Sequence, residues 1–233
     1  MNAVLASVTD VFEAELVVDC GVDWVDIKNP AAGALGAAAT PVIADIVRQV
    51  RGRRPVSATI GDTWVTPDVI PSRVAACAAT GVDYVKAGLD ARSPDAETRR
   101  LVAVAATHHP LIIVCRAELP PTPDDVATLA RCGIAGIMLD TADKAGPGLT
   151  ELHDAAVLAR FVDSARAAGI LCGLAGRLRR TDIAVLRPLG ADYLGFRSAL
   201  CRDGARTHRI DRTAATAIVE TMRRLPDHLT ATR

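Results

Sequence analysis

The chain has 233 residues, half of them hydrophobic and only 3% aromatic, and its 27 basic and 27 acidic residues cancel to a formal net charge of zero. A chain of this length can bury one large core, so we expect a single domain over residues 1–233. The balanced charge argues against nucleic-acid binding. The lack of a long apolar run or a basic leading segment argues against a membrane span or signal peptide, so a cytoplasmic location is expected.

Short apolar runs rich in β-branched residues recur along the chain. Each is followed by a helix-start signal and an amphipathic stretch, an alternation that is typical of repeated βα units. Eight such runs predict strands over residues 3–7, 24–28, 56–60, 84–88, 111–115, 136–140, 171–175 and 193–197.

The helices between these strands are marked at both ends. Thr40, Ser93 and Thr122 are each followed by proline, so the hydroxyl can cap free amides while proline occupies the first helical position. Thr150 and Thr181, each followed by an acidic residue, predict two further starts. Glycines placed shortly before five strands predict helix ends, because glycine adopts the left-handed turn most readily: Gly21, Gly81, Gly133, Gly169 and Gly190.

Eight units without a break in composition favour an α/β fold, a single closed (β/α)8 TIM barrel. The alternative is an open doubly wound sheet, which more often has about five or six strands. In barrels the active site lies at the carboxyl ends of the strands, so the residues that close each strand are the candidates for chemistry.

Lysine is rare in this chain, which contains only Lys28, Lys86 and Lys144 beside 24 arginines. Lys28 ends the second predicted strand, Lys86 lies near the end of the fourth, and Lys144 follows the sixth. All three thus belong to even-numbered strands, whose side chains share layers inside a barrel. Arginine stays protonated at neutral pH, whereas a lysine that is desolvated or crowded by other cations can become a nucleophilic amine. A Schiff base with a carbonyl substrate requires such an amine.

Two carboxylates accompany the lysines. Asp26 lies two residues before Lys28, so both side chains point to the same face of the strand. Asp140 ends the sixth strand, where a carboxylate near lysines would stay ionised and could orient an amine or relay protons. The structural alternative is that each lysine forms an ordinary ion pair with the carboxylate nearest in sequence.

Arginine and small residues gather after the seventh and eighth strands, where barrels commonly bind phosphate. Gly176 would let backbone amides approach an anion, and Arg177, Arg197 or Arg202 could supply forked donors. Ser198 follows Arg197 directly and is a further candidate for phosphate binding.

Residues near other strand ends are candidates for contacting a substrate. Ser57 and Thr59 could orient sugar hydroxyls, and Asp62 either joins them or caps its loop. Asn29 begins a long glycine-bearing loop, residues 29–41, that could serve as a lid or a second anion cradle.

Metal and disulfide chemistry have little support. The six cysteines are scattered without a C-x-x-C pair, and we expect them to fill the core. His108 and His109 are adjacent but lack the further ligands that zinc needs, so no metal site is expected.

Several segments, taken in chain order, resemble the (5-formylfuran-3-yl)methyl phosphate synthase family of methanofuran biosynthesis. The likeness extends from the first strand to the last helix. It rests on DIKNP at 26–30, GALGA at 33–37, SATIGD at 57–62, YVKAGL at 84–89, MLDTADKAG at 138–146, LAG at 174–176, GFRSALC at 195–201 and RID at 209–211.

The resemblance implies a lyase that condenses two molecules of glyceraldehyde 3-phosphate into 4-(hydroxymethyl)-2-furancarboxaldehyde phosphate, with loss of one phosphate and two waters. It implies no organic cofactor. It makes Lys28 the Schiff-base residue and Lys86 the proton acceptor, with Asp26, Asp140 and Lys144 assisting. Triose phosphates are therefore the expected partners. A homo-oligomer is an option, because small barrels often associate.

Three stretches depart from the family pattern. The loop after strand five is short, Arg177 replaces a small residue, and SALCRDGAR replaces a glycine-rich, lysine-bearing stretch after strand eight. These changes fall at positions for phosphate and the second substrate. Two alternatives therefore stay open: another Schiff-base aldolase acting on a phosphorylated aldehyde, and a non-catalytic barrel that binds a sugar phosphate.

Overall fold

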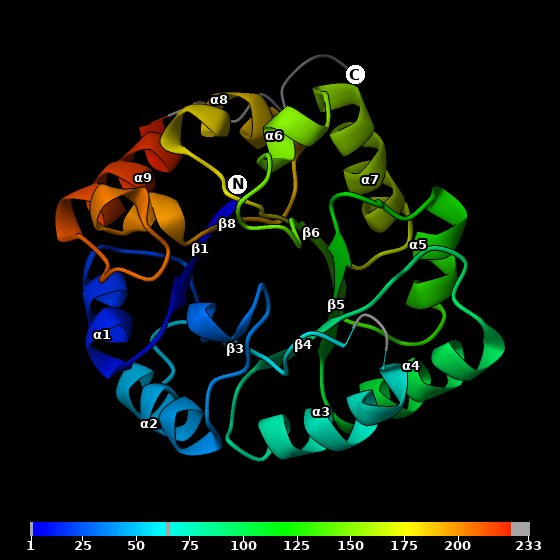
Figure 1. Cartoon of the computed structure of the whole chain (residues 1–233). Helices are drawn as coiled ribbons and strands as arrows, with labels where there is room; N and C mark the ends of the chain where they lie inside the picture. Colours follow the sequence, from blue (N-terminus) through cyan, green and yellow to red (C-terminus); the bar gives the residue numbers. More distant parts are fainter. Residues whose placement is uncertain (1, 64–65, 225–233) are drawn as a thin grey trace.

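Eight parallel strands close into a barrel in the computed structural model, which describes residues 2–63 and 66–224 (Figure 1). Each strand pairs with its neighbours in sequence, and β8 closes the sheet against β1. The predicted α/β barrel is thus confirmed, and an open sheet is excluded. The strands end within one residue of the predicted bounds: β1 (Ala3–Val8), β2 (Trp24–Ile27), β3 (Val56–Thr59), β4 (Tyr84–Gly88), β5 (Leu111–Arg116), β6 (Gly136–Asp140), β7 (Leu171–Leu174) and β8 (Tyr193–Phe196).

Helices surround the barrel on the outside (Figure 1). None of those within the described residues is long and apolar enough to cross a membrane. They are α1 (Val11–Asp19), α2 (Thr40–Val50), α3 (Ile70–Ala78), α4 (Ala96–His108), α5 (Pro123–Ala130), α6 (Leu149–Leu152), α7 (Ala155–Ala167), α8 (Ile183–Leu186) and α9 (Arg212–Arg224). Short 3₁₀ turns lie between them: η1 (Pro30–Ala32), η2 (Pro67–Val69), η3 (Arg180–Asp182), η4 (Arg187–Leu189), η5 (Ser198–Leu200) and η6 (Arg202–Gly204).

The predicted helix starts hold in part. Thr122 caps α5 as predicted, since its hydroxyl accepts the Asp125 amide at 3.2 Å. Thr40 is itself the first residue of α2 and caps nothing. The start predicted at Ser93 was wrong, because its amide is bonded by the Asp125 carboxylate at 2.9 Å and α4 begins later, after Asp95.

The two remaining starts fall inside short turns. Thr150 lies in the single turn α6, and the longer α7 begins after Asp154, whose carboxylate accepts the Val157 amide at 2.9 Å. Thr181 lies in η3. All five predicted helix-ending glycines have positive φ, between 69° and 87°.

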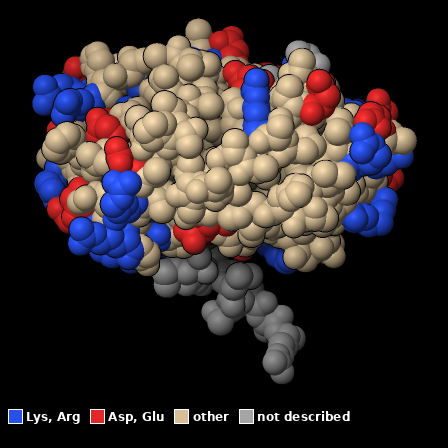
Figure 2. Space-filling view, turned by 90° about the horizontal axis from the view of Figure 1, so that it is seen from below, with Lys and Arg blue, Asp and Glu red and all other residues tan. Residues whose placement is uncertain are grey.

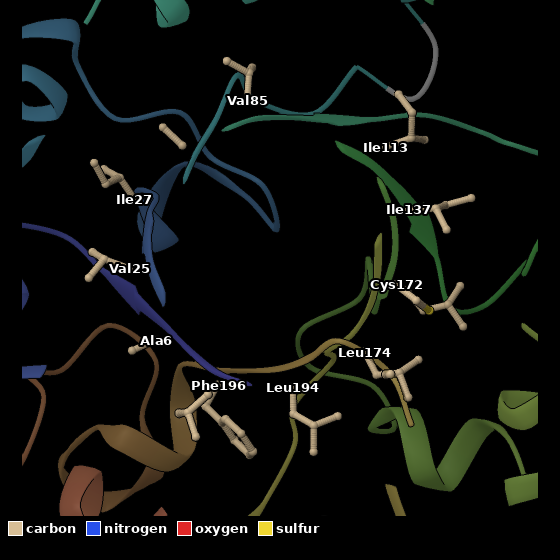
Figure 3. Packing of buried hydrophobic residues seen from close by; sticks show 14 of the residues in the cluster. Ala6, Val25, Ile27, Val85, Ile113, Ile137, Cys172, Leu174, Leu194 and Phe196 are labelled. Carbon is tan, nitrogen blue, oxygen red and sulfur yellow. The ribbon is translucent and has the colours of Figure 1, made fainter. Parts of the chain in front are cut away.

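The hydrophobic residues form two separate layers, one on each face of the barrel wall. On the outer face, side chains such as Val25, Ile137 and Leu194 point away from the barrel axis toward the helices (Figure 3). On the inner face, Leu5, Ile112 and others fill the barrel. Successive side chains of a strand point to opposite faces, so each strand supplies residues to both layers. Burial of each such side chain contributes about 1.5–3 kcal/mol to the stability of the fold.

Aromatic rings close the amino-terminal end of the barrel interior. Trp24 packs against Tyr84 and Tyr193 with ring centroids 4.8 and 5.0 Å apart. Tyr193 fits because Gly173 has no side chain, since a Cβ there would lie 2.2 Å from the Tyr193 ring. We call Trp24, Tyr84 and Tyr193 the floor of the barrel. Lys86 stands above it, its Nζ 5.3 Å from the Tyr193 ring centroid.

Charges of both signs occur on the outer surface. Figure 2 shows the side below the view of Figure 1, where basic and acidic side chains gather toward the two ends and the middle is largely uncharged.

Candidate active site

Asp26 lies at the carboxyl end of the barrel interior and is only 2% exposed. Ser7 on β1 and Ser57 on β3 flank it in the strand register and donate hydrogen bonds to its two oxygens at 3.1 and 2.6 Å. The Lys86 ammonium pairs with it at 2.9 Å. Burial alone would raise the pKa of Asp26, but Lys86, Lys28 and Ser57 hold it below its ordinary value. The carboxylate is therefore ionised at neutral pH.

Asp140, at the end of β6, is the second buried carboxylate. Lys144 reaches back from the following loop and donates to Asp140 Oδ1 at 2.5 Å. Lys28 approaches from the other side, with Nζ 3.9 Å from Oδ2. Burial would raise the pKa of Asp140, but Lys144 and Lys28 hold it below its ordinary value.

The three lysines differ in how their amines are held. Burial lowers the pKa of Lys86 and of Lys144, although the neighbouring aspartates oppose the shift. Each therefore loses its proton more readily than an exposed lysine. Lys28 makes the long contact with Asp140 but no hydrogen bond to any described residue. Its amine is the one least engaged by a carboxylate.

These contacts bear on the alternative of local ion pairs. Asp26 pairs with Lys86, two strands away, rather than with Lys28 on its own strand. Lys28 contacts Asp140 across the barrel. Of the three lysines, Lys144 alone bonds the carboxylate of its own segment. The contacts thus form a pair, Asp26 with Lys86, and a triad of Lys28, Asp140 and Lys144. The charge of Lys28 also acts on Asp26 and Lys86. All five side chains line one pocket, and we call them the lysine–aspartate cluster.

Two adjoining spaces lie at this end of the barrel. The inner pocket has a volume of about 30 Å³. Besides the lysine–aspartate cluster it is lined by Ser7, Leu35, Thr59, Gly176, Arg177, Arg197, Ser198 and Arg206, among others. The outer cleft, about 440 Å³, is lined by Lys144, Glu151, Arg177, Arg179, Ser198 and Arg206, among others.

The predicted phosphate residues are only partly brought together. Arg177 and Ser198 line both spaces, and Gly176 lines the inner pocket. Gly176 is also required by packing, since a Cβ there would lie 2.8 Å from the Thr141 methyl group. Arg202 is exposed and lines neither space.

Arg197 lines the inner pocket, but its guanidinium points into the protein. The two Nη atoms pair with buried Glu13, at 2.5 and 3.3 Å. The remaining N–H groups donate to the carbonyls of Ser7, Arg206 and His208, at 2.8–3.1 Å. A guanidinium has five donors, and all five have protein acceptors here. This geometry gives little support to a direct phosphate contact by Arg197.

The other polar candidates mostly organise loops. Ser57 bonds Asp26, and the Thr59 hydroxyl, in the inner pocket, donates to the Gly36 carbonyl at 3.1 Å. Asn29 caps η1 by accepting the Ala31 amide at 3.1 Å and does not line the inner pocket.

Asp62 holds a loop, which is one of the two roles that the sequence predicts for it. Its carboxylate accepts the Leu35 amide at 3.2 Å, which helps to hold residues 29–41 over the barrel. Leu35 is 3% exposed and lines the inner pocket, so this loop contributes an apolar wall to the site.

Three polar residues of the site were not predicted. Ser7 occupies the inward position of β1 beside Asp26, and the strand alternation alone could have identified it. Arg206 lies within the arginine-rich segment after β8, where the sequence favours Arg197 and Arg202. Glu13 gave no signal, because its partner Arg197 lies 184 residues away in the sequence.

Metal ligation has no geometric support among residues 2–63 and 66–224. No group of three or more histidine, cysteine, aspartate or glutamate side chains in them could hold a metal ion. The cysteines in this part of the chain are all free.

The closed parallel barrel and its polar carboxyl-terminal mouth define a protein of the (β/α)8-barrel enzyme class. Sequence comparison makes this more specific. The chain belongs to the 4-HFC-P synthase family, whose model matches residues 4–219.

Curated relatives named (5-formylfuran-3-yl)methyl phosphate synthase align with this chain over most of their length. The (5-formylfuran-3-yl)methyl phosphate synthase of Methanocaldococcus jannaschii is 35% identical over 225 residues, covering 89% of this chain and 94% of the relative. That of Methanopyrus kandleri is 36% identical over 208 residues, covering 83% and 87%.

Solved structures support the fold alone. A phosphoribosyl anthranilate isomerase from Thermus thermophilus superposes with a TM-score of 0.67 at 12% identity, covering 96% of this chain and 98% of that chain. A 3-hexulose-6-phosphate synthase superposes with a TM-score of 0.63 at 15% identity, covering 94% and 99%.

Proposed function

We propose that this protein is a lyase that condenses two molecules of glyceraldehyde 3-phosphate through a Schiff base at Lys28. The product is 4-(hydroxymethyl)-2-furancarboxaldehyde phosphate, a precursor for methanofuran-type furan biosynthesis, and one phosphate and two waters are released. The observation that carries the proposal is the Lys28 amine, which no described residue hydrogen-bonds although it lies within the lysine–aspartate cluster. Membership of the 4-HFC-P synthase family supports the furan product.

The first stage forms an imine. The neutral Lys28 amine attacks a triose carbonyl carbon, a C–N bond forms, and loss of water gives an iminium ion. Lys144 and Asp140 lie next to Lys28 and can donate and accept the protons that this step moves. The ionised Asp140 also stabilises the positive charge of the iminium.

The second stage makes the carbon–carbon bond. The iminium acidifies the adjacent carbon, and Lys86 accepts the proton, a role that fits an amine whose pKa burial lowers. Asp26 bonds the Lys86 ammonium and stabilises the charge gained. The resulting enamine carbon attacks the aldehyde of the second triose. Elimination of phosphate and dehydration, with hydrolysis of the imine, then lead to the aromatic ring.

Phosphate binding is assigned to the loops after β7 and β8. The inner pocket has room for little beyond the reacting carbons, whereas the outer cleft adjoins it and carries arginines. We place the phosphate of the bound triose where the two spaces meet, against Gly176, Arg177 and Ser198.

Borohydride reduction tests the proposal. The protein is incubated with glyceraldehyde 3-phosphate and sodium borohydride, and the modified peptide is located by mass spectrometry while furan formation is followed by its ultraviolet absorbance. The expected result is a triose phosphate adduct on Lys28 together with furan formation in unreduced samples. A Lys28→Arg variant, which keeps the charge, should give neither.

The same experiment separates the alternatives. An adduct on Lys28 without furan absorbance would indicate another Schiff-base aldolase. The lack of any adduct or product, with retained binding of the triose phosphate, would indicate a non-catalytic barrel. An adduct on Lys86 instead would exchange the roles assigned to the two lysines.

A further inference from the structure

Arg206 spans the opening between the inner pocket and the outer cleft. It is partly buried and lines both spaces. One N–H of its guanidinium donates to the Gly33 carbonyl at 3.1 Å, in the loop that follows β2. This is the one hydrogen bond that the guanidinium makes with the described part of the chain. Its other donors are therefore available to a ligand.

The charge around Arg206 suits an anion. Among the charged side chains that line the outer cleft are Lys144, Arg177, Arg179 and Arg206, against a single carboxylate, Glu151. Arg179 pairs with Glu151 at 3.0 Å, which offsets that negative charge. Lys144 is likewise paired, with Asp140 at 2.5 Å. Arg177 and Arg206 are then the cations of the cleft that make no ion pair with a described residue.

A buried ion pair holds the backbone from which Arg206 extends. Arg197 binds Glu13 at 2.5 Å, and its Nε donates to the Arg206 carbonyl at 2.8 Å. Glu13 also accepts the Ile210 amide at 3.1 Å and the Thr9 amide at 2.9 Å. Glu13 and Arg197 thus join α1, the end of β8 and both sides of the segment that carries Arg206.

We infer that Arg206 binds the phosphate of the triose attached to Lys28, and that Glu13 and Arg197 are positioning residues that hold Arg206 in place. The inference rests on the proposed function. Arg206 reaches the phosphate directly, whereas Arg197, whose donors are all occupied, acts through the Arg206 backbone. A forked guanidinium that bonds phosphate oxygens adds strength and geometric selectivity for phosphorylated aldehydes.

The first experiment compares phosphorylated with unphosphorylated substrate. Borohydride trapping at Lys28 is measured against increasing glyceraldehyde 3-phosphate and, separately, increasing glyceraldehyde. Arg206→Met should raise the half-saturating concentration for glyceraldehyde 3-phosphate about 10- to 100-fold, the value of a charged hydrogen bond, and leave that for glyceraldehyde unchanged. Arg206→Lys should retain part of the affinity. Arg202→Met removes an exposed arginine of the same segment and is the matched control.

Equal half-saturation of wild type and Arg206→Met with glyceraldehyde 3-phosphate would overturn the inference. Equal losses with both aldehydes would also overturn it, because Arg206 would then act on the lysine rather than on the phosphate.

The second experiment tests positioning. Glu13→Gln frees Arg197 from its charged partner, so the KM for glyceraldehyde 3-phosphate should rise several-fold while kcat and glyceraldehyde trapping stay near wild type. Glu13→Asp should recover part of the KM. A fall in thermal stability with unchanged KM would assign a purely structural role and overturn this part.

A third measurement separates failure of the inference from failure of the proposed function. Calorimetric titration with inorganic phosphate needs no Schiff base. If wild type forms no adduct at Lys28, the proposed function fails, but weaker phosphate binding by Arg206→Met than by Arg202→Met still supports the anion site. Equal phosphate binding by these two variants overturns the site.

Discussion

The floor and the mouth of the barrel are built from the same inward-facing strand positions but hold opposite kinds of residue. On β2, Trp24 lies in the floor and Asp26 at the mouth, and on β4 Tyr84 and Lys86 do the same. The floor is stabilised by aromatic packing. The mouth instead buries charges, which costs free energy unless each is paired. On these two strands, the residues that stabilise the floor and the residues that carry charge at the mouth therefore lie two positions apart.

The largest expected effect concerns Lys28, which has the longest carboxylate contact of the three lysines. Lys28→Arg should lower turnover about 10⁴-fold, because a guanidinium stays protonated and cannot form the imine. Stability should change little, since the Lys28 ammonium makes only a 3.9 Å contact. Steady-state assays of furan formation measure the turnover, and urea unfolding measures the stability. Substantial turnover by this variant would show that another amine forms the imine.

A paired mouth residue should affect stability as well. Lys86→Met leaves Asp26 buried without its cation, and we expect a loss of about 3–5 kcal/mol in the free energy of unfolding. Changing the pair together, Lys86→Met with Asp26→Leu, should regain most of that loss and remain inactive. Urea unfolding of the single and double variants measures this. No recovery in the double variant would mean that the pair is needed for packing.

A floor residue should show the reverse pattern. Gly173→Ala places a methyl group against the Tyr193 ring, and overpacking of this kind costs about 1–3 kcal/mol. Activity should fall less than for the mouth variants, provided that Lys86 keeps its contact with Asp26. Thermal unfolding and kcat are compared at one temperature. A loss of activity as large as that of Lys28→Arg would show that the floor takes part in positioning the amines.

The smallest effect is expected from pH. The folded-state pKa values of Asp26 and Asp140 lie below their ordinary values, so the stability they contribute is present above about pH 4 and is lost as the pH falls through the folded values. Asp26→Asn should therefore show a weaker loss of stability on acidification than wild type. Urea midpoints measured from pH 7 downward check this, and identical slopes would contradict it.

The fold could be predicted from the sequence because its signals are local. Each strand is a short apolar run, and glycines such as Gly21 end the preceding helix with a left-handed turn. The failure at Ser93 has a cause that lies outside its own segment. The proline after Ser93 predicts a helix start there. The Asp125 carboxylate, from the next βα unit, instead accepts the Ser93 amide, and α4 begins after Asp95.

The site was predictable for residues whose position depends on strand alternation. Alternation predicted that Asp26 and Lys28 share a face, and the even-numbered strands predicted that Lys86 lies near them. All three line the inner pocket. The partners were not predictable, because Lys86 pairs across two strands and Arg197 pairs with Glu13 at the other end of the chain. Which arginine faces the cleft depends on these long-range contacts, so sequence alone favoured Arg197 over Arg206.

The pairing of β1 with β8 has a consequence for how the molecule matures. The Ser7 hydroxyl donates a hydrogen bond to Asp26, and the Ser7 carbonyl accepts one from Arg197. The first and the last strand of the barrel therefore meet at Ser7. A nascent chain leaving the ribosome cannot complete this junction until β8 has been made. Translation intermediates that end before residue 197 should therefore lack a competent site, and reactivity would be acquired only as the barrel closes.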